Sequence, residues 1–248
     1  MILELDCGNS FIKWRVIDRE ASGIVHASGV SGELDQLLEE LLSLCAISIS
    51  RCRLVSVRGD VETRLLTETI AGSLGVEVVC AAPSTMLGGV TNGYEDVQRL
   101  GLDRWLAVVA AYQLCRKPCV VIDLGTAVTI DLVAGGGRHL GGYITPGMAL
   151  LTELLRTHTK RILYSAEEAR VALSDTSPGR STSEAVERGC LKMLRSYIED
   201  QIVCATQCFE QEPVTYVTGG DASLFTEARQ VEFVPDLVFK GLAIACPL

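Results

Sequence analysis

The hydrophobic and polar positions of the first half of the chain predict three strands followed by alternating helices and strands. Short runs rich in β-branched residues indicate strands over residues 2–5, 11–17 and 23–28. Leucines three and four positions apart indicate an amphipathic helix over 34–42. The next expected elements are a strand, a helix, a strand, a polar loop and a helix, over 53–57, 61–74, 76–80, 83–93 and 102–115.

The second half repeats this three-strand opening, with strands expected over 119–123, 127–133 and 139–144. The elements that follow are an amphipathic segment, a long helix, a strand and a further helix, over 148–155, 183–211, 214–217 and from about 222. Lys117 and Pro118 interrupt two apolar segments, so we place a domain boundary there. The sequence therefore predicts a duplicated α/β fold with domains 1–117 and 118–248.

A short loop containing an aspartate and a glycine follows the first strand of each half, at residues 6–9 and 123–126. Glycine allows a tight turn in which backbone N–H groups can approach a phosphate. A carboxylate and a phosphate repel each other in a cleft of low dielectric unless a cation lies between them. We therefore expect the two loops to line one cleft and to bind a nucleotide together with a metal ion.

In the first loop, the ammonium group of Lys13 can follow the charge that develops on a transferred phosphoryl group. Asp6 is suited to hold hydrated magnesium. The alternative interpretation makes Asp6 and Asn9 ordinary turn residues and Lys13 a solvated strand residue. The recurrence of the loop in the second half argues against this alternative.

In the second loop, Thr126 and the following backbone amides suit a phosphate, and Asp123 suits a cation. Thr129 alternates with apolar neighbours and is interpreted as an ordinary strand residue. Gly219 and Gly220 end another strand, where they either bring the backbone flat against a nucleoside or simply form a turn. The glycines within 141–147 either allow tight packing or leave space for a ligand, and the sequence does not decide between the two.

The segment around Asp103 is the clearest candidate for a catalytic role, because it starts a helix just after a flexible loop that contains Tyr94. Asp103 is placed to accept a proton from an alcohol while Arg104 binds an oxyanion. The alternative is that Asp103 only complements the dipole at the helix N-terminus and Arg104 is solvated.

Composition limits the functions further. The chain has 248 residues and a net charge of −9, and its basic residues are scattered, which disfavours direct nucleic-acid binding. No apolar stretch is long enough to cross a membrane and no signal peptide precedes the first strand, so we expect a cytoplasmic protein. Ten cysteines without a CxxC pair, and only three histidines, indicate reduced and buried side chains rather than a zinc site.

Five segments together resemble the type III pantothenate kinases, which belong to the superfamily of acetate kinase, sugar kinases, Hsp70 and actin. The resemblance covers nearly the whole chain, with all five motifs in the family's order. Ser10 stands where relatives often carry Thr, and it keeps a hydroxyl. The motifs are DxGNxxxK at Asp6, Gly8, Asn9 and Lys13, GxDR at Gly101, Asp103 and Arg104, DxGTA at Asp123, Gly125, Thr126 and Ala127, GGxIxPG at Gly141, Gly142, Ile144, Pro146 and Gly147, and TGG at Thr218, Gly219 and Gly220.

The resemblance implies two ribonuclease H-like domains of the actin-like ATPase type, with mixed sheets flanked by helices and an active-site cleft between them. It implies ATP-dependent phosphorylation of pantothenate to 4'-phosphopantothenate, the first step of coenzyme A biosynthesis. It also implies a homodimer whose active site lies at the subunit interface.

The same resemblance implies a role for each matching residue. Asp103 is then the general base, and Asp123 holds a monovalent cation, potassium or ammonium, in place of the divalent ion that the loop alone suggested. Magnesium stays with Asp6, through water. The implied pantothenate-binding residues are Tyr94, Gly101, Leu102, Asp103, Arg104 and, acting from the partner subunit, Thr182. The implied ATP-binding residues are Asp6, Cys7, Gly8, Asn9, Ser10, Lys13, Thr126, Gly219 and Gly220.

Two other functions are compatible with such a fold. A kinase with the same fold could phosphorylate a different small hydroxy or carboxylate compound, because a fold alone does not set the acceptor. A non-catalytic regulator could use the nucleotide cleft as a switch, but a switch needs no base for an acceptor alcohol. Asp103 and the neighbouring Tyr94 therefore favour a kinase that acts on pantothenate.

Overall fold

The computed structural model describes residues 1–18, 24–44, 47–225 and 231–248. These residues form two compact units, which we consider one at a time. Unit 1 comprises Met1–Leu114, Gly137–His139 and Asp236–Leu248, and unit 2 comprises Cys115–Gly136 and Leu140–Pro235. This division differs from the single boundary expected after residue 117, because the C-terminal segment groups with the first unit. The expected start of the third strand at Gly23 lies outside the described residues.

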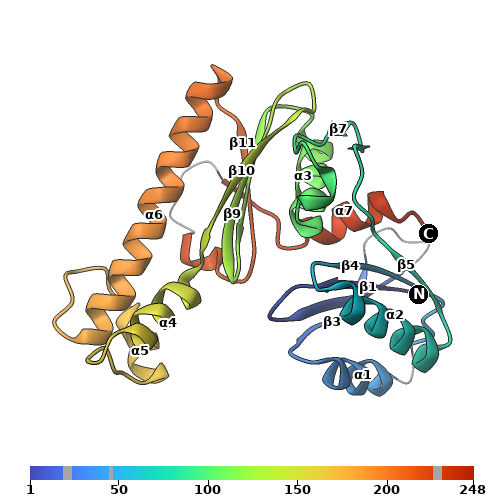
Figure 1. Ribbon diagram of the computed structural model, residues 1–248, viewed down its shortest axis with the longest axis horizontal. Coiled ribbons are helices and arrows are strands. Elements are labelled where there is room, and N and C mark those ends of the chain that lie inside the picture. The colour runs from blue at the N-terminus through green and yellow to red at the C-terminus, as the bar shows by residue number, and fades with distance from the viewer. Residues whose placement is uncertain (19–23, 45–46, 226–230) are drawn as a thin grey trace. The chain divides into compact units, whose positions relative to one another are not determined.

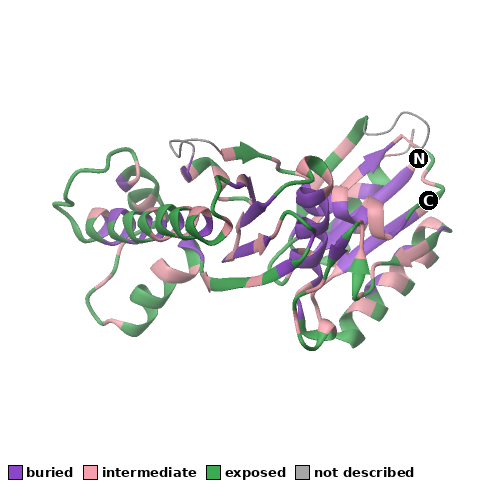
Figure 2. Cartoon of the chain, turned by 90° about the horizontal axis from the view of Figure 1, so that it is seen from above, coloured by how far each residue is buried: buried purple, intermediate pink, exposed green. Residues whose placement is uncertain are grey.

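A five-stranded mixed sheet forms the centre of unit 1 (Figure 1), with the strand order β3-β2-β1-β4-β5. The central strand β1 pairs antiparallel with β2 and parallel with β4, and it is buried over its whole length (Figure 2). The strands are β1 (Ile2–Cys7), β2 (Ile12–Ile17), β3 (Val25–Ser31), β4 (Arg51–Ser56) and β5 (Glu77–Cys80).

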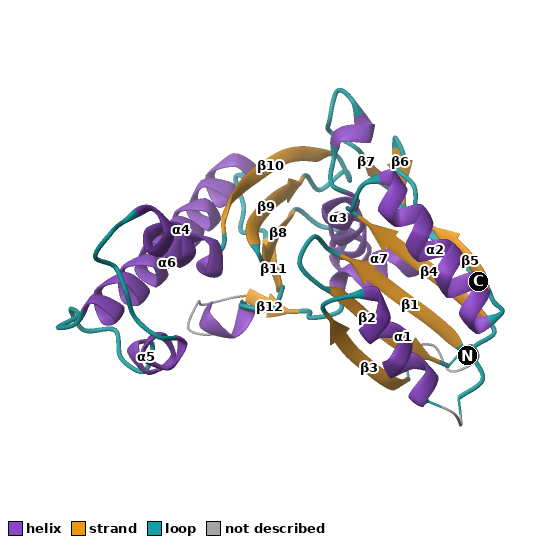
Figure 3. Ribbon diagram, turned by 60° about the horizontal axis from the view of Figure 1, so that its bottom comes forward, coloured by secondary structure: helices purple, strands orange, loops and turns teal. Residues whose placement is uncertain are grey.

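Helices cover both faces of this sheet, with α1 and α2 on one face and α3 and α7 on the other (Figure 3). Leu37 of α1 and Leu66 of α2 are buried in one apolar cluster with residues of β1. Gly75 ends α2 in a left-handed conformation (φ 64°) that glycine adopts without strain. The helices and short elements are α1 (Leu34–Ser43), α2 (Asp60–Leu74), β6 (Met86–Leu87), β7 (Val90–Thr91), the 3₁₀ helix η1 (Val97–Arg99), α3 (Leu102–Cys115) and α7 (Leu237–Ala245).

Unit 2 repeats this architecture. Its strand order, β10-β9-β8-β11-β12, again places the first strand at the centre, antiparallel to the second and parallel to the fourth. The long helix α6 runs beside the sheet, and α4 and α5 lie against its N-terminal part (Figure 1). The elements are β8 (Cys119–Leu124), β9 (Ala127–Val133), β10 (His139–Pro146), α4 (Met148–His158), α5 (Ala166–Ala172), α6 (Thr182–Phe209), β11 (Val214–Thr218), the 3₁₀ helix η2 (Ala222–Phe225) and β12 (Val231–Phe233).

The identical strand order of the two sheets confirms the predicted duplicated fold. No described helix is long and apolar enough to cross a bilayer. All cysteines within the described residues are free, but they are not uniformly buried as expected. The exposed ones are Cys80, Cys204 and Cys208.

A buried charge network attaches the C-terminal segment to the sheet of unit 1. Glu4 is fully buried and pairs with Arg15 and Arg53, which lie opposite it on the two neighbouring strands. Arg53 also donates from Nη1 to the carbonyl of Cys246 (3.1 Å), and Arg15 donates from Nη1 to Asp236 (3.0 Å). The two guanidinium groups therefore connect both ends of α7 to the central strands.

We expect Glu4→Ala to destabilise the protein by about 3–5 kcal/mol, because the buried Arg53 and the largely buried Arg15 lose their shared carboxylate. Urea unfolding followed by circular dichroism measures the change. The matched control, Glu167→Ala, removes the partner of the exposed Arg170 and should leave the unfolding midpoint nearly unchanged. A loss below about 1 kcal/mol for Glu4→Ala would show that the network does not hold unit 1 together.

Candidate active site

The first loop begins beside two opposite charges on one face of the unit 1 sheet. Asp6 is 8% exposed, and Lys13 lies directly opposite it on β2. Residues opposed in an antiparallel pair have Cβ atoms about 4.5–5.5 Å apart. The register therefore brings a carboxylate and an ammonium group together at the end of β1, where a cation and a phosphate can be bound side by side.

The first loop is held by a residue that follows the neighbouring strand β4. Asn9 and Ser10 are exposed, and the carbonyl of Gly8 accepts a hydrogen bond from Nε of Arg58 (2.8 Å). Sequence reasoning missed Arg58. A usable signal existed, because Arg58 follows β4, which is parallel to β1, and the ends of parallel strands meet at the same edge of a sheet.

Cys7 differs from the other residues assigned to the first loop. Its side chain is fully buried in the apolar cluster, on the face of the sheet opposite to Asp6. Burial, with the nearby Asp6 carboxylate as a smaller cause, raises the pKa of the Cys7 thiol to about 12. Only the backbone of Cys7 is therefore suited to contact a nucleotide.

Arg104 and Tyr94 lie together in unit 1, as the sequence suggested. Arg104 is 6% exposed, and its Nη1 donates to the hydroxyl of Tyr94 (2.9 Å). The Tyr94 ring also stacks with His139, with ring centroids 6.2 Å apart. Sequence reasoning missed His139, because this contact depends on the distant segment Gly137–His139 joining unit 1.

Asp103 is partly buried in the first turn of α3. Its Oδ1 accepts a hydrogen bond from the backbone N–H of Arg104 (2.7 Å), and the dipole at the helix N-terminus favours a carboxylate there. A Cβ atom on Gly101 would lie 2.8 Å from the same oxygen, so glycine gives the carboxylate its space. Leu102 is 9% exposed, so its side chain belongs to the core and only its backbone can face a substrate.

The second loop places a carboxylate between two hydroxyl-bearing residues. Asp123 of β8 lies in register with Thr129 on β9 and with Thr218 on β11. In-register residues on adjacent strands point to the same face of a sheet. Thr129, interpreted from the sequence as an ordinary strand residue, is therefore a neighbour of Asp123, and three oxygen-bearing side chains form one row across the sheet.

Two glycines pack tightly against the second loop. A Cβ atom on Gly147 would lie 2.2 Å from the carbonyl oxygen of Gly125, and one on Gly219 would lie 2.4 Å from that of Leu124. Gly219 also has a φ of +97°, which favours glycine. The amide of Gly147 donates to the carbonyl of Thr126 (3.0 Å). For Gly147 the open question from the sequence is answered in favour of close packing, and together the two glycines fix the loop from both sides.

Other glycines of the motifs have different roles. Gly220 is exposed, and a Cβ atom there would meet nothing within 4 Å, so the backbone beside the second loop is accessible. Gly141 adopts a φ of +100°, so glycine is favoured there by its backbone conformation and not by close packing.

Thr182 is the first residue of α6 and is exposed. The preceding Ser181 caps the helix, with its Oγ accepting from the amide of Glu184 (3.2 Å). The hydroxyl of Thr182 is therefore presented at a well-defined helix start in unit 2.

The two aspartates fit different cations. Among the described residues, no group of three or more His, Cys, Asp or Glu side chains is placed to hold a metal ion. A single carboxylate such as Asp6 suits Mg²⁺, which keeps several waters and takes its other ligands from substrate phosphates. Asp123, with the hydroxyls of Thr129 and Thr218 in its row, offers one negative and several neutral oxygens, a donor set that suits a cation of lower charge.

Two units with the same mixed sheet order, flanked by helices, define the duplicated ribonuclease H-like fold of the actin-like class. A Campylobacter jejuni protein described as a Baf family transcriptional activator aligns over 97% of this chain and 94% of its own, with a TM-score of 0.61 and 22% identity. A Sinorhizobium meliloti protein described as a 2-dehydro-3-deoxygalactonokinase aligns over all of both chains, with a TM-score of 0.54 and 14% identity. At such identities the likeness concerns the fold alone.

The family follows from the sequence relatives. The model of the type III pantothenate kinase family matches residues 2–203. A type III pantothenate kinase of Ectopseudomonas mendocina is 54% identical, and one of Pseudomonas aeruginosa 53% identical, each over the full length of both chains. The chain therefore belongs to the type III pantothenate kinases, which confirms the family predicted from the five motifs.

Gly147→Ala tests whether the second loop depends on close packing. We expect a loss of about 1–3 kcal/mol in stability, because the added methyl group meets the loop backbone, together with weaker ATP binding in calorimetry. The matched control is Gly189→Ala in α6, where a Cβ atom meets nothing, and a gain of about 0.5–1 kcal/mol is expected. Parental stability and ATP affinity in Gly147→Ala would contradict the assigned packing role.

Proposed function

We propose that this chain transfers the terminal phosphoryl group of ATP to the primary hydroxyl of pantothenate, forming 4'-phosphopantothenate in the first step of coenzyme A biosynthesis. The observation that carries the proposal is the match to type III pantothenate kinases over the full length. The contact between Arg104 and Tyr94 beside Asp103 supports it further, because a small acidic substrate needs such a local cation in a chain of net charge −9. We place the reaction in the cytoplasm.

The two loops are assigned to ATP. Lys13 neutralises charge on the transferred phosphoryl group, and Asp6 holds hydrated magnesium, which when bound neutralises the phosphate oxygens. Thr126 and the amides after it contact a phosphate, and the open backbone at Gly220 lies against the nucleoside. Asn9 and its neighbours complete the first loop, with backbone amides as donors.

The acceptor is assigned to the start of α3. Asp103 accepts the proton of the pantothenate hydroxyl as it attacks, while Arg104 and Tyr94 orient the substrate. Phosphoryl transfer needs little covalent help from the protein, so orientation, charge neutralisation and one base account for most of the rate. The Arg104 amide, which donates to Oδ1 of Asp103, fixes this carboxylate at the start of α3.

The remaining assignments extend beyond one subunit. Asp123, supported by Thr218, holds potassium or ammonium beside the second loop. The enzyme is a homodimer with its active site at the subunit interface, and Thr182 contacts the pantothenate bound by the partner. The exposure of Thr182 at the start of α6 supports this role.

Asp103→Asn should lower kcat by about 100- to 10,000-fold and leave ATP affinity nearly unchanged, because the amide cannot accept the proton. ADP release coupled to added pantothenate measures the rate. The matched control is Asp35→Asn, which changes another carboxylate in the first turn of a helix, α1. If Asp103 served only the helix dipole, the two variants would behave alike, and both would keep nearly parental turnover.

Replacing potassium by sodium at constant ionic strength should lower the rate of the parent enzyme. The same replacement should make little difference to Asp123→Asn, which loses the carboxylate of the proposed cation site and should be slow in both salts. Initial rates in potassium, ammonium and sodium chloride measure the effect. Equal parental rates in all three salts would exclude the proposed monovalent cation.

A further inference from the structure

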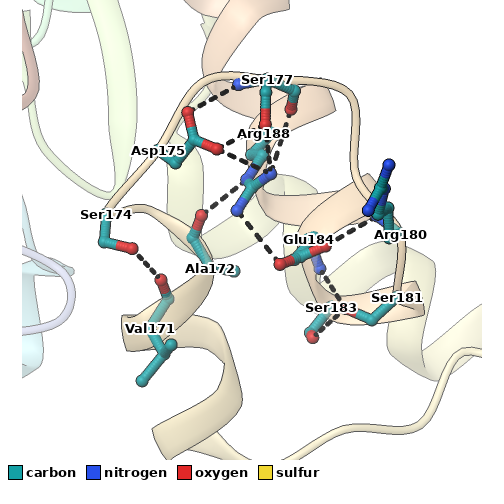
Figure 4. Close-up of polar contacts among 10 residues, drawn as sticks. All are labelled: Val171, Ala172, Ser174, Asp175, Ser177, Arg180, Ser181, Ser183, Glu184 and Arg188. Atoms are coloured by element: carbon teal, nitrogen blue, oxygen red, sulfur yellow. Dashed lines mark hydrogen bonds and ion pairs between the residues drawn. The ribbon is translucent and has the colours of Figure 1, made fainter.

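An exposed segment before α6 is held in place by one buried side chain. Residues 174–182 connect α5 to α6, and each of them is exposed, so the segment contributes almost nothing to the apolar core of unit 2. Arg188, in the second turn of α6, points back under this segment and is only 7% exposed (Figure 4).

The guanidinium of Arg188 binds the segment at several points. Its Nε donates to the carbonyl of Ala172 at the end of α5 (2.8 Å), and its Nη1 donates to the carbonyl (3.1 Å) and Oγ (3.2 Å) of Ser177. Its Nη2 donates to Glu184 (3.2 Å), and Asp175 forms an ion pair with it at 3.6 Å. One side chain thus joins the end of α5, the middle of the segment and the first turn of α6.

The end of the segment nearest to Thr182 is fixed through Glu184. The second carboxylate oxygen of Glu184 accepts from the amide of Arg180 (2.7 Å), which lowers the pKa of this carboxyl group. A Cβ atom on Gly179 would lie 2.4 Å from the backbone nitrogen of Ala185, so the chain runs directly against α6 at this point. The backbone next to Thr182 therefore has one defined course.

Stability alone gives a weak reason for this arrangement. Burying a guanidinium is costly, and an apolar side chain of similar size often serves the fold as well or better. Arg188 nevertheless directs its hydrogen bonds at a segment that buries little and lies on the surface. Surface segments held in one conformation by a rigid scaffold are typical of ligand-binding loops.

We propose that Arg188 is a positioning residue for pantothenate binding, which holds residues 174–181 so that the Thr182 hydroxyl is presented to the substrate. This inference rests on the proposed function, in which Thr182 contacts pantothenate. The inference does not depend on which subunit supplies the other pantothenate-binding residues, because all the contacts of Arg188 described above lie within unit 2.

Steady-state kinetics of Arg188→Gln test the proposal. We expect the KM for pantothenate to rise about ten- to hundredfold, because the acceptor-binding hydroxyl is misplaced, while the KM for ATP stays at the parental value. Arg188→Lys should lie between the parent and Arg188→Gln, because a lysine keeps the charge but not the fork of donors. Ser177→Ala, at an exposed position, should give a smaller rise and keeps the test valid if Arg188→Gln does not fold.

Two further variants distinguish a positioning role of Arg188 from an unspecific loss of stability or activity. Thr182→Ala combined with Arg188→Gln should be no worse than the more severe single variant, because both changes remove the same contact. Arg170→Gln, which breaks an exposed pair on α5, is the matched control and should leave both KM values unchanged.

The proposal is overturned if the folded Arg188 variants keep the parental KM for pantothenate, if both KM values rise equally, or if the double variant shows additive losses. A parent without pantothenate-dependent ADP release would instead refute the proposed function. A normal KM for pantothenate in Thr182→Ala would refute the role of Thr182 and this inference with it. A raised KM in Thr182→Ala beside normal Arg188 variants would overturn this inference alone.

Discussion

The alternation of side chains along the central strand of each sheet is the constraint on which the site depends. In unit 1, Leu3 and Leu5 enter the apolar cluster beneath α1 and α2, so Glu4 and Asp6 lie on the opposite face. In unit 2, Ile122 and Leu124 enter the core beside α6, so Asp123 lies on the opposite face. A shift of one residue in either strand would exchange the core face for the site face. The apolar pattern that folds each sheet therefore also places a carboxylate at its functional edge.

Local patterns predicted most of the helices and strands, because hydrophobic period and turn residues are local properties of the sequence. For α3 and β9 the predicted bounds equal the observed ones. The local patterns missed β6, β7, η1, α5, β12 and α7, and the helix expected from about residue 222 is only the short 3₁₀ helix η2. The place of α7 depends on contacts between residues far apart in the chain, such as Arg53 with Cys246. Gly241 adds a second such contact, since a Cβ atom there would lie 2.1 Å from the carbonyl oxygen of Leu106. Met193 of α6 follows the buried Cys190 by three positions but is 52% exposed, because helical period alone does not define the width of the face that the core covers.

The residues of the candidate site divide in the same way, into those predicted from local patterns and those that depend on contacts with distant segments. Motif residues such as Asp6 and Asp103 were predictable, because each stands next to a recognisable strand end or helix start. His139 and Arg188 were not, because each acts on a ring or backbone carbonyl supplied by another element, and Arg58 was missed although its place after β4 gave a usable signal. In the proposed function, the motif side chains carry charge and proton transfer, and the residues outside the motifs hold the segments that present them.

The central claim is that Asp103 is the base for the pantothenate hydroxyl. A crystal structure of the protein with pantothenate and a non-hydrolysable ATP analogue tests it most directly. We predict that a carboxylate oxygen of Asp103 lies within hydrogen-bond distance of the primary hydroxyl, about 2.6–3.2 Å, with the hydroxyl in line with the terminal phosphate. The hydroxyl pointing away from Asp103, or pantothenate bound apart from Arg104 and Tyr94, would contradict the account.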